Sequence, residues 1–232
     1  MIPKKIHYVW VGQQPKSRLI QSCLQTWRRR LPDYEIIEWN EDNFDMHENA
    51  YIEQAYRAKK WAFVSDYIRA RVLFEQGGIY LDTDVRVLAR LDSLLANQAF
   101  IGFENATYLS AAIIGAEAGN SFIKAILDSY QHLDFRFDPA DPMVGVNSLS
   151  VTEIAQRSGL TAGNHEQILA NGLHVYPDGI LCNPSHQSKT IHLFAGTWLD
   201  RQPLRHQLVI WLKQRLNTPQ AAGWYQKLVR HD

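Results

Sequence analysis

The sequence has few cysteines, no net charge and no long uninterrupted apolar run. Its 24 Lys plus Arg balance its 24 Asp plus Glu, so no overall field attracts nucleic acid or an anionic membrane. No stretch reaches the roughly 18 apolar residues of a membrane span, and the N-terminus, with its Pro and Lys residues, lacks the apolar core of a signal peptide. Cys23 and Cys182 are too few and too far apart for a disulfide framework or a cysteine metal site. We therefore expect a cytoplasmic protein with two buried thiols and no nucleic-acid partner.

The sequence also lacks internal repeats and low-complexity linkers, so we expect a single domain. Its 232 residues with 46% hydrophobic content suffice for one core. Strand-like runs lie at 6–11, 34–39, 99–103, 111–115, 173–176 and 191–194, and 79–87 is predicted to form a strand, a turn and a second strand. Helical patterns lie at 20–30, at 48–75 with a break near 59–60, and from 120 onward, whereas 135–145 resembles a loop. The alternation predicts an α/β fold with a mostly parallel central sheet flanked by helices.

Two aspartates follow an apolar run in the segment Gly77-Gly78-Ile79-Tyr80-Leu81-Asp82-Thr83-Asp84-Val85. Asp82 and Asp84 lie two apart, so on an extended strand both point to one face, which Tyr80 shares. Carboxylate oxygens suit Mg²⁺ or Mn²⁺, and an ion with so few protein ligands completes its shell with water and substrate phosphates. A solvated turn pair is the competing interpretation, but the apolar frame predicts buried carboxylates, which need a function.

Three further polar residues allow two interpretations each. Asp66 and Arg69 lie three apart on a predicted helix, so they share one face. They form either an ordinary surface ion pair or, because the helix leads into Gly77, part of the same site. In that site Arg69 would meet phosphate or a donor hydroxyl, and Asp66 would accept from a sugar hydroxyl. His192, within an apolar run, is either a core residue or a ligand.

The segments 62–69 and 77–85, with Leu73 between them, together resemble the sugar-binding region of glycosyltransferase family 32. That family includes yeast initiating mannosyltransferases and bacterial capsule or lipopolysaccharide transferases. The segments are also similar to the catalytic domains of clostridial glucosylating toxins. Residues 2–12, 113–116, 120–122 and 192–198 resemble other blocks of the family, so the resemblance extends from residue 2 to about 200.

The resemblance implies a Rossmann-like GT-A catalytic domain over 1–200, followed by a helical extension over 201–232. It also implies a divalent cofactor, Mn²⁺ or Mg²⁺, and transfer of a hexose with retention of configuration. The donor would be a UDP- or GDP-linked sugar. The acceptor would be a glycan or a lipid-linked glycan, in bacterial surface polysaccharide synthesis.

The resemblance assigns roles to residues on both sides of the aspartate pair. Donor nucleotide and sugar contacts are implied for Val9, Trp10, Asp66, Arg69, Tyr80, Asp82 and Trp198, with Trp10 as the ring that stacks on the base. The implied metal ligands are Asp84 and His192, and the implied catalytic set is Asp66, Arg69, Asp82 and Asp84. The chain departs from the family at Ser110-Ala111-Ala112, where relatives often carry an Asn. One donor-sugar contact therefore differs here.

Two other functions compete with this interpretation. A magnesium-dependent phosphatase of the haloacid dehalogenase type also uses an Asp-x-Asp pair, but it needs a later Gly-Asp segment, which this sequence lacks. A non-enzymatic carbohydrate-binding module would use the 7 Trp and 10 Tyr residues, most of which fall at core spacing.

The C-terminal stretch is basic and amphipathic, with apolar residues at Leu204, Leu208, Trp211 and Leu212. It either packs against the catalytic core or docks on the inner leaflet of a membrane.

Overall fold

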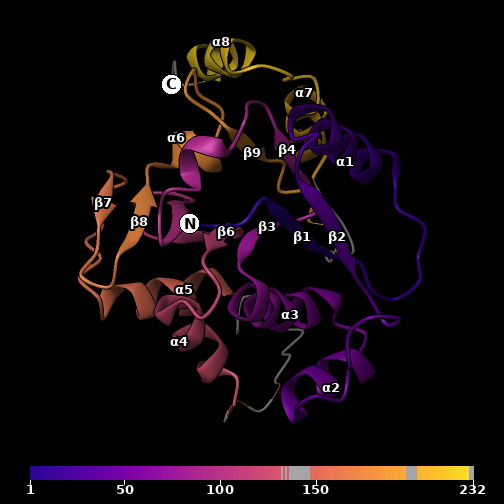
Figure 1. The fold of residues 1–232 in the computed structure, drawn as a ribbon. Helices are drawn as coiled ribbons and strands as arrows, with labels where there is room; N and C mark the ends of the chain where they lie inside the picture. Colours follow the sequence, from indigo (N-terminus) through magenta and orange to yellow (C-terminus); the bar gives the residue numbers. More distant parts are fainter. Residues whose placement is uncertain (132, 134, 136–146, 197–202, 230–232) are drawn as a thin grey trace.

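The computed structural model describes residues 1–131, 133, 135, 147–196 and 203–229 (Figure 1). The elements in chain order are β1 Lys5–Val9, α1 Arg18–Arg30, β2 Glu35–Trp39, α2 Ala50–Arg57, α3 Trp61–Gln76, β3 Gly78–Leu81, β4 Val85–Val87, the 3₁₀ helix Asp92–Leu94, β5 Ala99–Phe103, β6 Leu109–Ala116, α4 Ser121–Ser129, α5 Asn147–Gln156, β7 Gln167–Ile168, β8 Leu173–Tyr176, α6 Asp178–Leu181, β9 Thr190–His192, α7 Leu204–Lys213 and α8 Pro219–Val229.

The central sheet has seven strands in the order β2-β1-β3-β6-β5-β8-β7. Strands β1, β2 and β3 run parallel to one another, and β5 runs parallel to β8. Strand β6 is antiparallel to both β3 and β5, and β7 is antiparallel to β8. Five strands therefore point one way and two the other, which confirms the predicted α/β class with a mostly parallel sheet. A separate ribbon pairs β4 with β9 in antiparallel fashion.

Helices cover both faces of the sheet. Figure 1 shows α2, α3, α4 and α5 on one side, and α1 with α7 and α8 on the other. Successive residues of β6 alternate accordingly, since Ile114 packs in the cluster with α3 while Ile113 packs in the cluster with α1. All eight residues of β6 are buried, as a strand between two helical layers requires.

Most predicted elements are present with small changes in their ends. The ranges predicted for β5 and β8 match the structure. The long helix breaks where predicted, because α2 ends at Arg57 and α3 begins at Trp61. The short elements α5, α6 and β7 were not predicted. The segment 135–145, predicted as a loop, lies almost entirely outside the described residues.

The strand, turn and strand predicted over 79–87 are confirmed. The aspartate pair lies in the turn, so the interpretation that places both carboxylates on one face of an extended strand is wrong. Strand β3 ends at Leu81 and β4 begins at Val85. A turn joins them, in which Val85 N–H donates to the Asp82 carbonyl at 2.9 Å. The two carboxylates converge because the backbone turns, and strand alternation has no part in it.

The C-terminal helices pack against the ribbon of β4 and β9. Leu216 and Ala222 lie in a cluster with Ile191, Leu193 and Cys23. The predicted burial of both thiols is confirmed, since Cys23 and Cys182 are free and buried. Within the described ranges, no helix is long and apolar enough to cross a membrane.

Trp27 connects α1 to the strand that follows the aspartate turn. Its side chain is 0% exposed, and its indole Nε1 donates to the Val85 carbonyl at 2.8 Å. Thr26, the preceding residue, accepts through Oγ1 from Val87 N–H at 3.0 Å. Helix α1 therefore holds β4 through its backbone groups, directly after Asp84.

We predict that Trp27→Phe lowers the free energy of unfolding by about 2 kcal/mol or more, because it leaves a cavity and an unpaired buried carbonyl. Urea unfolding followed by circular dichroism measures this change. The matched control is Trp224→Phe on α8, where the side chain is 71% exposed and the change should stay within about 0.5 kcal/mol. Equal effects of the two substitutions would show that Trp27 does not stabilise the contact between α1 and β4.

Candidate active site

The site lies at the carboxyl ends of the parallel strands in the central sheet. Strands β1, β3 and β5 all end there, because β6 is antiparallel to both of its neighbours. The β1–β3 register pairs His7 with Tyr80, which brings Val9 and Trp10 to the same edge as Asp82. Ligands of open α/β sheets bind at the carboxyl ends of strands. The topology therefore gathers residues distant in sequence at a suitable place.

Two glycines make the sharp turn from α3 into β3. Gly77 and Gly78 have φ angles of 62° and 113°, which other residues rarely adopt. A Cβ on Gly77 would lie 2.7 Å from the backbone nitrogen of Ala118, and one on Gly78 would lie 2.8 Å from Nε2 of His7. The glycine pair thus permits both the turn and the close packing behind Asp82.

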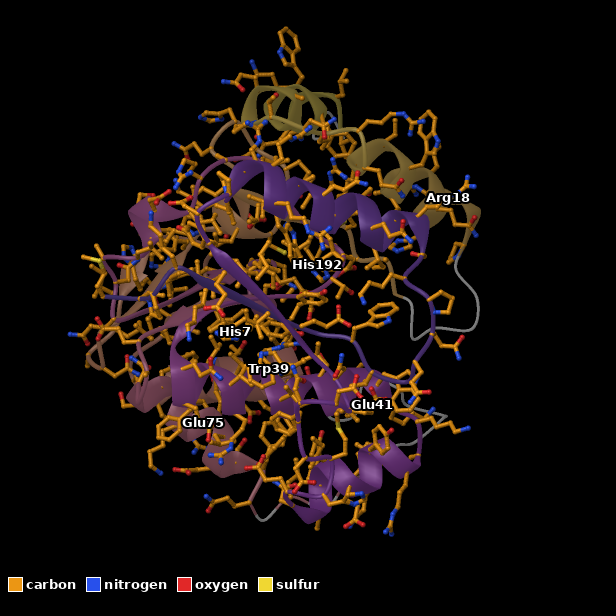
Figure 2. The ribbon with its side chains drawn as sticks, turned by 45° about the vertical axis from the view of Figure 1, so that its right-hand side comes forward. His7, Arg18, Trp39, Glu41, Glu75 and His192 are labelled. Carbon is orange, nitrogen blue, oxygen red and sulfur yellow. The ribbon has the colours of Figure 1, made fainter. Side chains whose placement is uncertain are left out.

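His7 supports this turn from the neighbouring strand, and Figure 2 shows it beside Trp39. Trp39 Nε1 donates to His7 Nδ1 at 3.1 Å, so the remaining ring proton lies on Nε2, which donates to the Gly77 carbonyl at 2.8 Å. Burial lowers the pKa of His7 to about 4. The ring is therefore neutral at physiological pH and acts as a fixed hydrogen-bonding bridge.

Arg69 joins the helix, the turn after β3 and strand β6 in one network. Its Nη1 donates to the Ala111 carbonyl at 2.7 Å, and its Nη2 lies 3.0 Å from Asp82 Oδ1. The same Nη2 lies 3.1 Å from Asp66 Oδ1, so one guanidinium serves two carboxylates. Asp66 and Arg69 therefore form a buried pair joined to Asp82 and not an ordinary surface ion pair.

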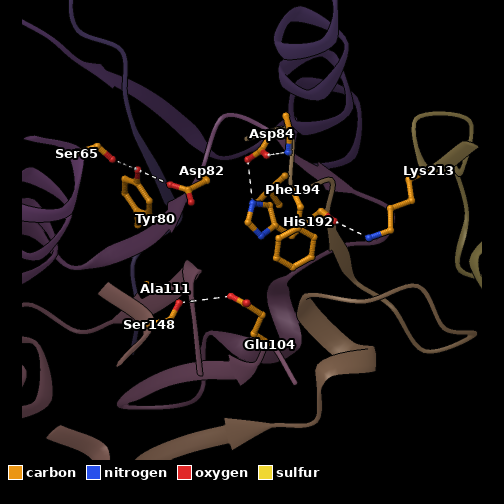
Figure 3. A network of polar contacts seen from close by, with 12 residues as sticks. Ser65, Tyr80, Asp82, Asp84, Glu104, Ala111, Ser148, His192, Phe194 and Lys213 are labelled. Atoms are coloured by element: carbon orange, nitrogen blue, oxygen red, sulfur yellow. Dashed lines mark hydrogen bonds and ion pairs between the residues drawn. The ribbon is translucent and has the colours of Figure 1, made fainter. Parts of the chain in front are cut away.

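Tyr80 fixes the orientation of Asp82. Its hydroxyl donates to Asp82 Oδ1 at 2.9 Å and lies 3.0 Å from Ser65 Oγ (Figure 3). The Tyr80 side chain is buried, with 1% exposure. This burial places Tyr80 behind Asp82 and leaves its ring little surface for a ribose or a base.

Asp66 is the less well compensated of the two carboxylates that share Arg69. Burial raises its pKa to about 6 in spite of the Arg69 charge and a 2.9 Å hydrogen bond from Asn147 Nδ2. The Oδ1 atom of Asn147 is buried and has no partner among the described residues. Asp66 and Asn147 thus present hydrogen-bond acceptors that a sugar hydroxyl could satisfy.

Asp84 pairs with His192 across the β4–β9 ribbon, in which Val85 is the register partner of His192. His192 Nε2 lies 3.2 Å from Asp84 Oδ1, and Ala195 N–H donates to Asp84 Oδ2 at 2.7 Å. Burial opposes ionisation of both groups. Nevertheless their mutual attraction lowers the pKa of Asp84 from its ordinary value. It also raises the pKa of His192 well above its ordinary value. The two side chains therefore form a buried ion pair.

Asp82, Asp84 and His192 fit a divalent ion. One potential ligand atom from each residue lies within 4.8 Å of the others. Nδ1 of His192 is buried without a hydrogen-bond partner among the described residues. Two carboxylates and an imidazole suit Mn²⁺ or Mg²⁺. Of the two sequence interpretations of His192, this geometry favours the ligand.

Two polar residues near this cluster were missed in the sequence. Glu104 follows β5, and its Oε2 accepts from Ser148 Oγ at 3.4 Å (Figure 3). Burial raises the pKa of Glu104. Lys213 on α7 donates to the His192 carbonyl at 3.3 Å. Glu104 carried no recognisable motif, and the amphipathic pattern around Lys213 indicated only a packed or membrane-facing helix.

The remaining predicted residues have varied positions. Val9 is the buried last residue of β1. Trp10 is half-buried, and its ring lies 5.3 Å from the Lys16 ammonium group. Trp198 lies outside the described residues. At the position where the family pattern departs, Ser110 Oγ is buried and has no partner among the described residues.

Related sequences among curated proteins include yeast mannosyltransferases and a protein of Legionella pneumophila. Inositol phosphoceramide mannosyltransferase 3 of Schizosaccharomyces pombe is 24% identical over 147 residues, which cover 59% of this chain and 39% of that protein. Subversion of eukaryotic traffic protein A of Legionella pneumophila is 27% identical over 164 residues, which cover 56% and 25%. The matches thus span less than half the length of these relatives.

Solved glycosyltransferases share the fold. The PaToxG glycosyltransferase aligns with a TM-score of 0.53 and 22% identity, over 67% of this chain and 69% of that chain. The glycosyltransferase GlyE of Streptococcus pneumoniae, in its apo form, aligns with a TM-score of 0.52 and 10% identity, over 99% and 64%. The GT-A fold predicted from the sequence is confirmed.

A family model described as "Glycosyltransferase sugar-binding region containing DXD motif" matches residues 17–101. That range includes Asp66, Arg69 and the aspartate pair. The resemblance to glycosyltransferase family 32 is thereby confirmed, and residues 17–101 are similar to a DXD-containing sugar-binding region.

Proposed function

We propose that the chain is a metal-dependent, retaining glycosyltransferase. It would transfer a hexose from a UDP- or GDP-linked donor to a glycan or lipid-linked glycan in bacterial surface polysaccharide synthesis. The convergence of Asp82, Asp84 and His192 beside the Arg69 network carries this proposal. The family match, which covers Arg69, Asp82 and Asp84, favours it over a phosphatase or a sugar-binding module.

The donor would lie across the carboxyl ends of β1 and β3. Trp10 would stack on the base, next to Val9 at the end of β1. Asp66 and Asn147 would accept hydrogen bonds from the sugar, and Arg69 would keep Asp66 and Asp82 in place. Trp198 would close over the diphosphate. Tyr80, because it is buried, would act through Asp82.

Asp84 and His192 would hold Mn²⁺ or Mg²⁺, with Asp82 beside them, and the bound ion would offset negative charge on the leaving diphosphate. Lys213 lies buried behind His192, with its Nζ 5.0 Å from the centroid of the Phe194 ring, and burial lowers its pKa. We further propose a front-face reaction. The acceptor oxygen bonds to the anomeric carbon as the carbon–phosphate oxygen bond breaks, and the acceptor proton passes to the departing phosphate.

A lipid-linked acceptor agrees with two observations. The Schizosaccharomyces pombe relative is named for mannosyl transfer to inositol phosphoceramide. Helices α7 and α8 also expose Leu208, Trp211, Trp224 and Leu228 near basic residues such as Lys227. Such a surface suits peripheral contact with the inner face of a cytoplasmic membrane.

We predict that Asp84→Asn reduces Mn²⁺-dependent release of nucleoside diphosphate by at least about 100-fold, because the pair with His192 loses its negative charge. A panel of UDP- and GDP-sugars provides the assay, and calorimetric Mn²⁺ titration provides a readout independent of activity. The matched control is Asp128→Asn, an exposed carboxylate paired with Lys124 on α4, which should behave as wild type. A folded Asp84→Asn protein with wild-type Mn²⁺ affinity and turnover would refute the assignment.

A pH-dependent prediction concerns Asp66. Its pKa in the folded protein, about 6, lies above the ordinary value, so the folded state favours the protonated form. Stability from this group is therefore full below about pH 4 and is lost as the pH rises through 6. We expect Asp66→Asn to abolish donor turnover. Between pH 4 and pH 7, Asp66 should lower the free energy of unfolding of the wild type by about 1–3 kcal/mol, and the Asp66→Asn variant should lack this decrease.

Urea unfolding of both proteins at the two pH values measures this difference. Parallel pH profiles for wild type and Asp66→Asn would show that Asp66 has an ordinary pKa. They would contradict the raised pKa that burial gives Asp66.

A further inference from the structure

A polar cavity lies away from the aspartate cluster, between α1, β4 and the turn that joins α7 to α8. It has a volume of about 680 Å³ and is lined by Arg29, Arg86, Arg215, Ser22, Gln214 and Asn217, among others. Figure 2 shows α1, which begins at the labelled Arg18, beside the C-terminal helices. We call this cavity the arginine pocket. Its size falls in the range of small-molecule sites.

Arg86 is a buried charge whose hydrogen-bond partners are neutral. Its side chain sits on β4 with 4% exposure. Its guanidinium donates to the Leu216 carbonyl at 3.2 Å, to Ser22 Oγ at 3.4 Å and to Asn217 Oδ1 at 2.5 Å. Within the described part of the chain, no carboxylate oxygen lies within 4.0 Å of it. Arg69, which is also buried, has by contrast two carboxylate partners.

The neighbouring arginines increase the positive charge. Arg29 and Arg215 also line the pocket, and neither has a carboxylate within 4.0 Å among the described residues. Arg30 donates through Nη2 to the Asn217 carbonyl at 2.7 Å, while its Nε is buried and has no partner in the described ranges. Three guanidinium groups, those of Arg29, Arg86 and Arg215, thus line one cavity without a counter-charge from the described residues. The buried charge of Arg86 is unfavourable without a counter-charge, which an anion in the cavity would supply.

The donor groups indicate which anion fits. Guanidinium groups form paired hydrogen bonds with phosphate oxygens, and the Gln214 amide adds a neutral donor. We propose that the arginine pocket binds a phosphate group, either free phosphate or the phosphate of a lipid headgroup. This inference does not depend on the proposed transferase activity, because none of the pocket residues belongs to the donor site.

One contact at the rim of the arginine pocket favours a lipid ligand. The Arg215 guanidinium lies 3.3 Å from the centroid of the Trp211 ring, and Trp211 is exposed. A tryptophan beside arginines is typical of side chains at the surface of an anionic bilayer. The test therefore includes a free-phosphate arm and a vesicle arm.

The experiment uses the full chain with a chelator present, so that cations cannot bridge phosphate to Asp84. Calorimetry with inorganic phosphate forms one arm. Sedimentation with phosphatidylcholine vesicles, with and without phosphatidic acid, forms the other. We expect saturable binding in at least one arm, and at least about tenfold weaker binding by the Arg29→Gln/Arg215→Gln variant. Both residues are exposed, so this variant should fold.

The matched control is Arg28→Gln. Arg28 is an exposed arginine on the same helix that does not line the pocket, so binding should stay close to wild type. Binding to phosphate alone would identify a soluble ligand, and binding only to phosphatidic acid vesicles would identify a lipid headgroup. No binding in either arm, or equal weakening by Arg28→Gln, would overturn the proposal.

Discussion

The buried guanidinium of Arg69 is the interaction on which the rest of the site depends. It connects α3, the turn after β3 and the first residues of β6 through Asp66, Asp82 and the Ala111 carbonyl. The cation also lies 4.4 Å from the Tyr80 ring centroid. Removing a buried charge from such a network leaves its partners uncompensated, at a cost of about 3–5 kcal/mol. These three segments therefore keep one relative position, and that position directs Asp82 towards Asp84 and His192.

The charges of the site are divided between two groups. Asp82 is held by Arg69 and Tyr80, whereas Asp84 is held by His192 and by the backbone of Ala195. The first group is neutralised by an arginine that cannot lose its proton. The second relies on an imidazole, whose proton a metal ion can replace. This difference explains why the geometry points to Asp84 and His192 as the principal ligands, and to Asp82 as the link to the sugar.

Local patterns in the sequence were sufficient to predict most strands and helices. They did not predict the long-range contacts. Strand β5 is buried along its whole length and was predicted correctly because its apolar run is bounded by polar residues. The turn between β3 and β4 was predicted, but its shape was not, because it depends on the pairing of β4 with β9, about a hundred residues later. Glu104 lies in no motif, and Asn147 follows a segment without a clear pattern. The arginine pocket combines parts of α1, β4 and the turn after α7, which no local window contains.

The central claim is that Asp82, Asp84 and His192 form a divalent metal site. Anomalous diffraction at the manganese edge, from a crystal of the full chain soaked in Mn²⁺ and a nucleoside diphosphate, tests it most directly. We expect one strong peak in contact with Asp84 and His192, beside Asp82. A peak elsewhere, or well-ordered diphosphate at the edge of the sheet with no peak between these side chains, would contradict it.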